Sequence, residues 1–186
     1  GMDFFQLKGA VERILAGLRI SDVTFEAESE NPSYHPGRCA KVYAGGKLLG
    51  VLGQIHPLAA ANYGVDAELY TAELQLDGML AARGVTPVYT PLPRFPAVTR
   101  DIAIVCAADI PVAKLSACIL AAGGQYLKGC ELFDVYTGAP IPVGYKSVAF
   151  SLTLRADDQT LTDDHAEETM QSVLKALKET FNATIR

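Results

Sequence analysis

The strongest constraint on the fold is the alternation of large and small side chains in residues 146–154, KSVAFSLTL. The two sets are Val148, Phe150, Leu152 and Leu154 on one parity and Ser147, Ala149, Ser151 and Thr153 on the other. Because a strand sends successive side chains to opposite faces, one face of this strand is apolar and the other carries only small side chains. The segment is therefore predicted to lie in a sheet that buries one face.

The segments around this strand complete a β-α-β-β-α-β pattern. Strands are expected at residues 100–106, 130–136, 146–154 and 183–186, and helices are expected after Pro111 and after Thr162. This order is the ferredoxin-like arrangement, in which both helices cover the same side of a four-stranded antiparallel sheet. The bulky parity of residues 146–154 then faces the helices, and the small parity lies on an open side.

Four prolines in residues 84–96, GVTPVYTPLPRFP, interrupt any regular element, because proline neither continues a helix nor donates to a central ladder. We place a domain boundary there, which gives domains at 1–86 and 87–186. The first domain is predicted to combine a helix at 3–18 with an antiparallel sheet that contains a hairpin at 41–54. The fold class expected for the whole chain is α+β.

The charge of the chain gives no sign of an autonomous nucleic-acid binder. The formal net charge is −5, with −3 in residues 1–86 and −2 in residues 87–186. Proteins that bind nucleic acid mainly by neutralising phosphates are usually basic. Small residues on the open side would still let RNA bases approach, and they would equally suit contact with solvent or with a neighbouring domain.

Residues with catalytic or metal-binding chemistry are sparse. The four cysteines form no CxxC pair, which favours buried thiols in a reducing compartment without disulfides or zinc. His35 and His56 each precede a proline, which is typical of a turn or a helix entry, and a metal or general-base role is the alternative interpretation. No catalytic site, no metal site and no membrane span are expected.

Four motifs in the second domain carry a family resemblance: PRFPAVTRDIAIV (93–105), ELFDVYTG (131–138), GYKSVAFSLTL (144–154) and QTLTDDH (159–165). They resemble the ferredoxin-fold anticodon-binding domain that closes the β chain of bacterial phenylalanyl-tRNA synthetase. The first domain contains DFFQLKG (3–9), YHPGRCAKVY (34–43) and LGQIHP (52–57), which resemble the end of the catalytic-like module of that chain. That module is similar to a class II synthetase core without its active site.

The resemblance implies a cytoplasmic, non-catalytic fragment that binds the anticodon region of tRNA(Phe) and acts as a scaffold. The family assembles two α and two β chains, and the α chain activates phenylalanine with ATP; ATP and magnesium are thus expected for the intact enzyme and not for this fragment. We expect the fragment to be monomeric and to bind tRNA weakly on its own, because its charge provides no steering field.

The tRNA-binding candidates are cations near the predicted strands, an aromatic residue and small polar residues of the open side: Arg94, Arg100, Lys128, Lys146, Arg155, Tyr136, Ser147, Ser151 and Thr153. If Asp134 avoids the core, parity places Leu132, Asp134 and Tyr136 on the open side and Phe133 and Val135 inward, and the same rule places Asp101 on the open side. The aspartates either orient a cation or serve as structural acceptors. The alternative function is a ferredoxin-like regulatory or protein-interaction module with no RNA role, and an enzyme would need a pocket of titratable groups.

Overall fold

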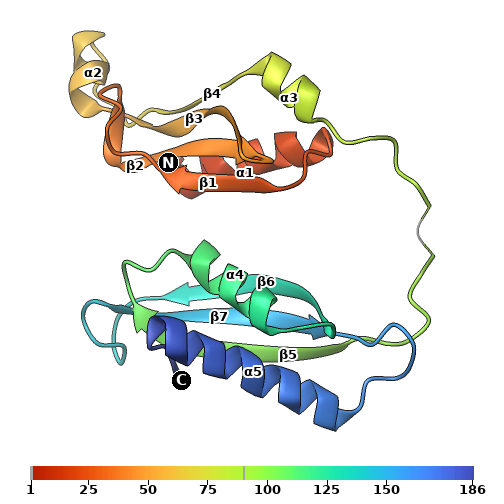
Figure 1. Ribbon diagram of the computed structural model, residues 1–186. Coiled ribbons are helices and arrows are strands. Elements are labelled where there is room, and N and C mark those ends of the chain that lie inside the picture. Colours follow the sequence, from red (N-terminus) through yellow and green to blue (C-terminus); the bar gives the residue numbers. More distant parts are fainter. Residues whose placement is uncertain (1, 90) are drawn as a thin grey trace. The chain divides into compact units, whose positions relative to one another are not determined.

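The computed structural model describes residues 2–89 and 91–186, and it contains two compact units, Gly1–Tyr89 and Thr90–Arg186 (Figure 1). Each unit has its own antiparallel sheet and its own buried core. The expected boundary at 86/87 falls in the irregular segment that follows the last helix of unit 1. The α+β class predicted from the sequence is confirmed.

Unit 1 has a four-stranded sheet of order β1-β2-β3-β4, with strands Val23–Ala27, Tyr34–Ala44, Lys47–Ile55 and Tyr70–Leu74. Its helices are α1 (Phe4–Gly17), α2 (Pro57–Asn62) and α3 (Leu76–Ala82). Asp3 and Gln6 form the expected capping box at the start of α1. Val11 and Leu15 of α1 pack on Val42 and Leu52 of the sheet, so the amphipathic helix covers one face of it.

The two proline-linked histidines of unit 1 stabilise local backbone. The Nδ1 atom of His35 accepts the Gly37 N–H at 3.0 Å. His56 is the N-cap of α2, and its Nδ1 atom accepts the Leu58 N–H at 3.2 Å. The position of His56 agrees with the helix-entry interpretation, whereas His35 lies within β2, in the irregular stretch of its register between Tyr34 and Cys39.

Unit 2 contains β5 (Val98–Ala107), α4 (Val112–Ala122), β6 (Leu127–Tyr136), β7 (Tyr145–Leu154), α5 (Asp163–Phe181) and β8 (Thr184–Ile185). The strand order is β6-β7-β5-β8, and every pairing is antiparallel. This arrangement confirms the ferredoxin-like topology. Thr162 caps α5 by accepting the His165 N–H, and Asn182 ends it in the left-handed region.

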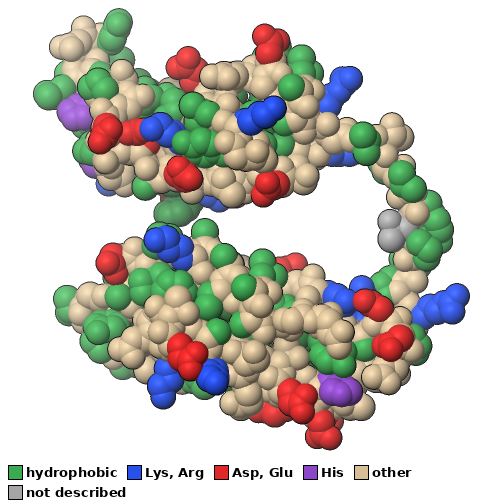
Figure 2. Space-filling model, viewed as in Figure 1, with side chains coloured by type: hydrophobic (Ala, Val, Ile, Leu, Met, Phe, Trp, Pro, Cys, Tyr) green, Lys and Arg blue, Asp and Glu red, His purple; other side chains and the backbone are tan. Residues whose placement is uncertain are grey.

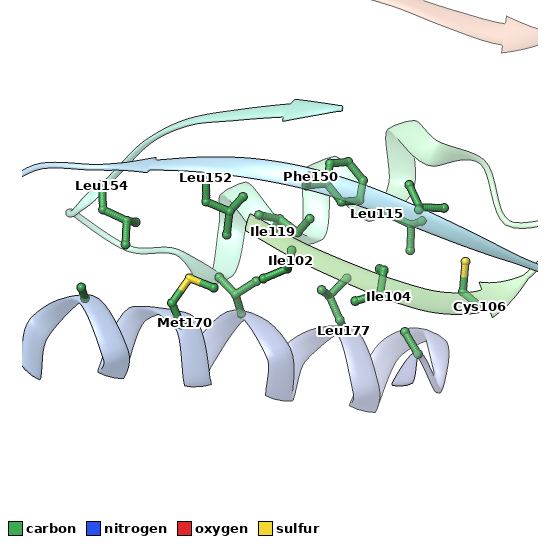
Figure 3. Close-up of a cluster of buried hydrophobic side chains, with 14 of the residues drawn as sticks. Ile102, Ile104, Cys106, Leu115, Ile119, Phe150, Leu152, Leu154, Met170 and Leu177 are labelled. Carbon is green, nitrogen blue, oxygen red and sulfur yellow. The ribbon is translucent and has the colours of Figure 1, made fainter. Parts of the chain in front are cut away.

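Both helices of unit 2 cover the same face of its sheet. The bulky parity of β7 is completely buried, and its side chains lie in one cluster with Leu115 and Ile119 of α4 and with Met170 and Leu177 of α5 (Figure 3). Ile102 and Ile104 of β5 extend the same layer. No described helix of unit 2 lies on the opposite face of the sheet, as the alternation in residues 146–154 predicts.

The register of β6 differs from the expected parity because the strand contains two irregularities. Leu132 pairs with Phe150 and Asp134 pairs with Ala149, which leaves Phe133 as an extra residue. A bulge of this kind sets two residues against one on the partner strand and reverses the parity beyond it. The predictions for Leu132 and Phe133 are therefore wrong: Leu132 has the helix-side register, and Phe133 is 59% exposed instead of buried.

No described helix is long and apolar enough to cross a bilayer. Within residues 2–89 and 91–186, no group of three or more His, Cys, Asp or Glu side chains is arranged to hold a metal ion. All four cysteines are free, and Cys39 and Cys106 are buried.

Candidate nucleic-acid interface

The candidate interface is the helix-free face of the unit 2 sheet, which we call the open face. Its members follow from the strand register: Thr99, Asp101, Ala103 and Val105 of β5, Ser147, Ala149, Ser151 and Thr153 of β7, and Gly129, Glu131, Asp134 and Tyr136 of β6. Thr184 of β8 pairs with Val105 and extends this face to the sheet edge. On the open face, β7 thus contributes only small side chains, and it lies between β5 and β6 in the sheet.

Two larger side chains meet over one end of this face. Tyr136 lies directly opposite Ser147, and the Arg186 N–H donates to the Ala103 carbonyl. The guanidinium carbon of Arg186 is 5.9 Å from the centre of the Tyr136 ring, which is near the outer limit of a cation–π contact. Ser147 and Ala149 are only 4% and 8% exposed, whereas Ser151 and Thr153 are partly accessible polar side chains of β7.

The Tyr136 ring is fixed in position while keeping an accessible surface. Its hydroxyl donates to the Ala139 carbonyl at 2.8 Å, which holds the ring against the turn after β6. The residue is 40% exposed. A fixed, accessible aromatic ring is the feature that stacks splayed RNA bases in sheet-based RNA-binding domains.

A second charged group lies at the other end of the open face and consists of Lys128, Arg155 and Asp157; we call it the Lys128–Arg155 cluster. Lys128 occupies the first irregularity of β6, between Leu127 and Gly129, which pair with Leu154 and Thr153. Its Nζ atom is 2.7 Å from Oδ2 of Asp157, and Nε of Arg155 is 4.0 Å from Oδ1 of the same carboxylate. The Lys128 hydrogen bond holds the pKa of Asp157 below its usual value, so this carboxylate is ionised at neutral pH.

The middle of the open face is acidic. Asp101 and Glu131 both pair with Ser151 from opposite sides, and Asp134 pairs with the neighbouring Ala149. Within residues 2–89 and 91–186, no ion pair involves Asp101 or Asp134. Positive charge is thus confined to the two ends of this face.

Two of the candidate cations lie outside the open face. Arg100 pairs with Leu152 on the helix side, and its Nη2 atom is 3.3 Å from Oδ1 of Asp163 at the start of α5. Lys146 is buried opposite Cys106, and its Nζ atom donates to the carbonyls of Ala108 (3.0 Å) and Ile110. Arg94 is exposed in the loop before β5. A role of these three residues in tRNA binding stays a prediction.

The sequence reasoning overlooked Arg186, Glu131 and Asp157. Arg186 reaches Tyr136 only because β8 pairs with β5 at the far edge of the sheet. Glu131 joins the open face because the extra residue Phe133 reverses the parity between Glu131 and Asp134. Figure 2 shows basic and acidic side chains interspersed on the surface of each unit that is turned to the viewer.

Comparisons with known proteins relate both units to domains of phenylalanyl-tRNA synthetase. Residues 93–186 match the ferredoxin-fold anticodon binding domain, and residues 1–76 match the CLM domain of the phenylalanyl tRNA synthetase beta chain. The whole chain is 44% identical to a phenylalanine–tRNA ligase beta subunit from Moorella thermoacetica and 40% identical to one from Clostridium acetobutylicum. A corresponding subunit from Bacillus subtilis is 41% identical. The chain spans 23% of the length of each of these relatives.

Proposed function

The chain belongs to the family of the phenylalanyl-tRNA synthetase β chain, and from this we propose that the open face of unit 2 binds the anticodon region of tRNA(Phe). The carrying observation is that α4 and α5 cover one face of the sheet and leave the other with small side chains beneath an accessible Tyr136 ring. Small side chains next to an aromatic ring leave space for a flat nucleobase, which can then stack on the ring.

Recognition at this face rests on bases more than on phosphates. The ring of Tyr136 supplies stacking, and the hydroxyls of Ser151 and Thr153 supply hydrogen bonds along the same strand. The carboxylates of Asp101, Glu131 and Asp134 accept hydrogen bonds from amino groups of bases, and they repel phosphates. This division of roles accounts for an RNA-binding domain whose charge is not basic.

The wider assignment concerns the longer protein, because the chain spans under a quarter of its relatives. We propose that this protein is the β chain of a cytoplasmic phenylalanine–tRNA ligase that pairs with α chains in an α2β2 assembly. The ATP and magnesium of the reaction then belong to other parts of that assembly. Unit 1, with its histidines engaged in backbone contacts, serves as a non-catalytic scaffold.

The test replaces Tyr136 by alanine in the full-length β subunit within the assembled ligase. Loss of one base-stacking contact costs about 1–3 kcal/mol, so the KM for tRNA should rise by about 5- to 150-fold. Amino-acid activation, measured by exchange of pyrophosphate into ATP, should not change. Tyr63→Ala is the matched control, since Tyr63 is an 87% exposed tyrosine of unit 1. An unchanged KM for tRNA in a folded Tyr136→Ala enzyme contradicts the proposal.

A protein-interaction role has one observation in its favour. β6 is an edge strand of the sheet, and its Leu132, Phe133 and Val135 side chains are 47%, 59% and 45% exposed. Exposed apolar edge strands can pair with another chain. A concentration-dependent dimer of this chain in sedimentation experiments, lost in a Phe133→Lys variant, would favour that role, and a monomer favours RNA binding.

A further inference from the structure

The Lys128–Arg155 cluster lies at the end of the open face opposite Tyr136. Tyr136 pairs with Ser147 and Gly129 pairs with Thr153, so six residues of β7 separate the two ends. At about 3.3 Å per residue this is a distance of about 20 Å. The cluster is therefore too far from Tyr136 to contact the same nucleotide, and any RNA group that it binds belongs to another part of the molecule.

The cluster holds more positive charge than its carboxylate neutralises. The Lys128 and Arg155 side chains are 27% and 26% exposed, and both point to the single carboxylate of Asp157. Nε of Arg155 is fully buried without a hydrogen-bond partner, and the 4.0 Å separation from Asp157 is too long to supply one. A buried guanidinium donor without an acceptor is a costly arrangement that an anion at this position would relieve.

The Asp157 side chain is placed so that it can be displaced from Lys128 and Arg155. Its side chain is 73% exposed, in a bend that follows β7, whereas the neighbouring Ala156 is 2% exposed and fixed in the core. The backbone N–H of Arg155 donates to the Tyr126 carbonyl at 2.8 Å, which fixes the backbone of Arg155 independently of Asp157. The two cations are therefore held by the sheet while their counter-ion is held only by a surface bend.

We propose that Lys128 and Arg155 bind a backbone phosphate of the RNA, and that the Asp157 carboxylate occupies the phosphate position in the free protein. This inference rests on the proposed function of the open face. The Asp157 carboxylate lies within hydrogen-bond distance of Lys128 but 4.0 Å from Nε of Arg155, whereas a phosphate, with more acceptor oxygens in a tetrahedral arrangement, can accept from both cations at once. Because Asp157 must be displaced, RNA that contacts the cluster alone binds weakly, and RNA that also reaches Tyr136 binds well.

The experiment measures binding of a tRNA(Phe) transcript to the assembled ligase with full-length β subunit, at several salt concentrations. Asp157→Asn should tighten binding about fivefold at low salt, since it removes one unit charge next to the phosphate. Asp158→Asn removes the same charge from the next residue and should have a smaller effect. Lys128→Gln with Arg155→Gln should weaken binding and lower the slope of log K against log salt by about one, the value for a single phosphate contact.

The triple change of Lys128, Arg155 and Asp157 separates competition from general repulsion. If Asp157 acts by occupying the phosphate position, its replacement gives no gain once both cations are gone. Thermal unfolding of each variant checks that β6 and β7 stay paired. Equal effects of Asp157→Asn and Asp158→Asn, or a salt slope unchanged in the double glutamine variant, would overturn the inference. If Tyr136→Ala still weakens binding in that case, the proposed function stands without it.

Discussion

The assignment of the two sheet faces makes a sharp prediction about neighbouring residues of β7. Phe150 is completely buried between the sheet and both helices, whereas Ser151, the next residue, is half-buried on the open face (Figure 3). Phe150→Ala removes a whole aromatic ring from the core and should cost about 3–5 kcal/mol. Ser151→Val leaves the core untouched and should change the stability by about 0.5 kcal/mol or less.

The loss of stability expected for Phe150→Ala is large relative to the total stability of a small domain, which is about 5–15 kcal/mol. In a domain of this size 1 kcal/mol shifts Tm by about 4–8 °C, so Phe150→Ala should lower the Tm of unit 2 by at least about 12 °C. Urea unfolding followed by hydrogen exchange of peptides from each unit separates unit 2 from unit 1. Unit 1 serves as the internal reference, because Phe150 belongs to the core cluster of unit 2 alone.

A loss below about 1 kcal/mol for Phe150→Ala would refute the reasoning, since no fully enclosed aromatic side chain is removed so cheaply. A comparable loss of stability for Ser151→Val would also refute the assignment of the two faces. That result would mean that the small parity of β7 is also packed against part of the chain.

Two further predictions concern unit 1. The buried Glu28 carboxylate accepts the N–H groups of Glu30 and Asn31 and pairs with Lys41, which lowers its pKa. Its contribution to stability is therefore complete above the pKa of a free glutamate and is lost as the pH falls through the lower folded value. Urea unfolding between pH 7 and pH 3 should show this loss in the native chain and a smaller one in Glu28→Gln; equal profiles would contradict it. Gly9→Ala should stabilise α1 by about 0.5–1 kcal/mol in the same assay, because nothing lies within 4 Å of a Cβ atom there, and a destabilised variant would show that this helix face is occupied.

Much of the fold of unit 2 follows from local patterns. The alternation in residues 146–154 identifies which side of β7 the helices cover, and it also places Lys146 on the parity of Val148. The ammonium of Lys146 donates to two loop carbonyls, so its long side chain stabilises the entry to α4, and a contact of Lys146 with RNA stays a prediction.

The details of the open face could not be predicted in the same way. LKGCELFDVY of β6 contains nothing that distinguishes Lys128 and Phe133 as extra residues, because a bulge is defined by the pairing with β7 and not by one strand. The contact of Arg186 with Tyr136 joins residues fifty positions apart through two intervening strands. Long-range pairing of this kind depends on the assembled sheet.

The acidic middle of the sheet has a consequence for the conformation of the RNA. A double helix laid along β7 would bring a continuous line of phosphates over Asp101, Glu131 and Asp134, and each would be repelled. A loop that turns its nucleobases toward the protein and its sugars outward keeps those phosphates in water. If the open face binds RNA as proposed, the carboxylates favour unpaired nucleotides over paired ones, whatever the individual bases.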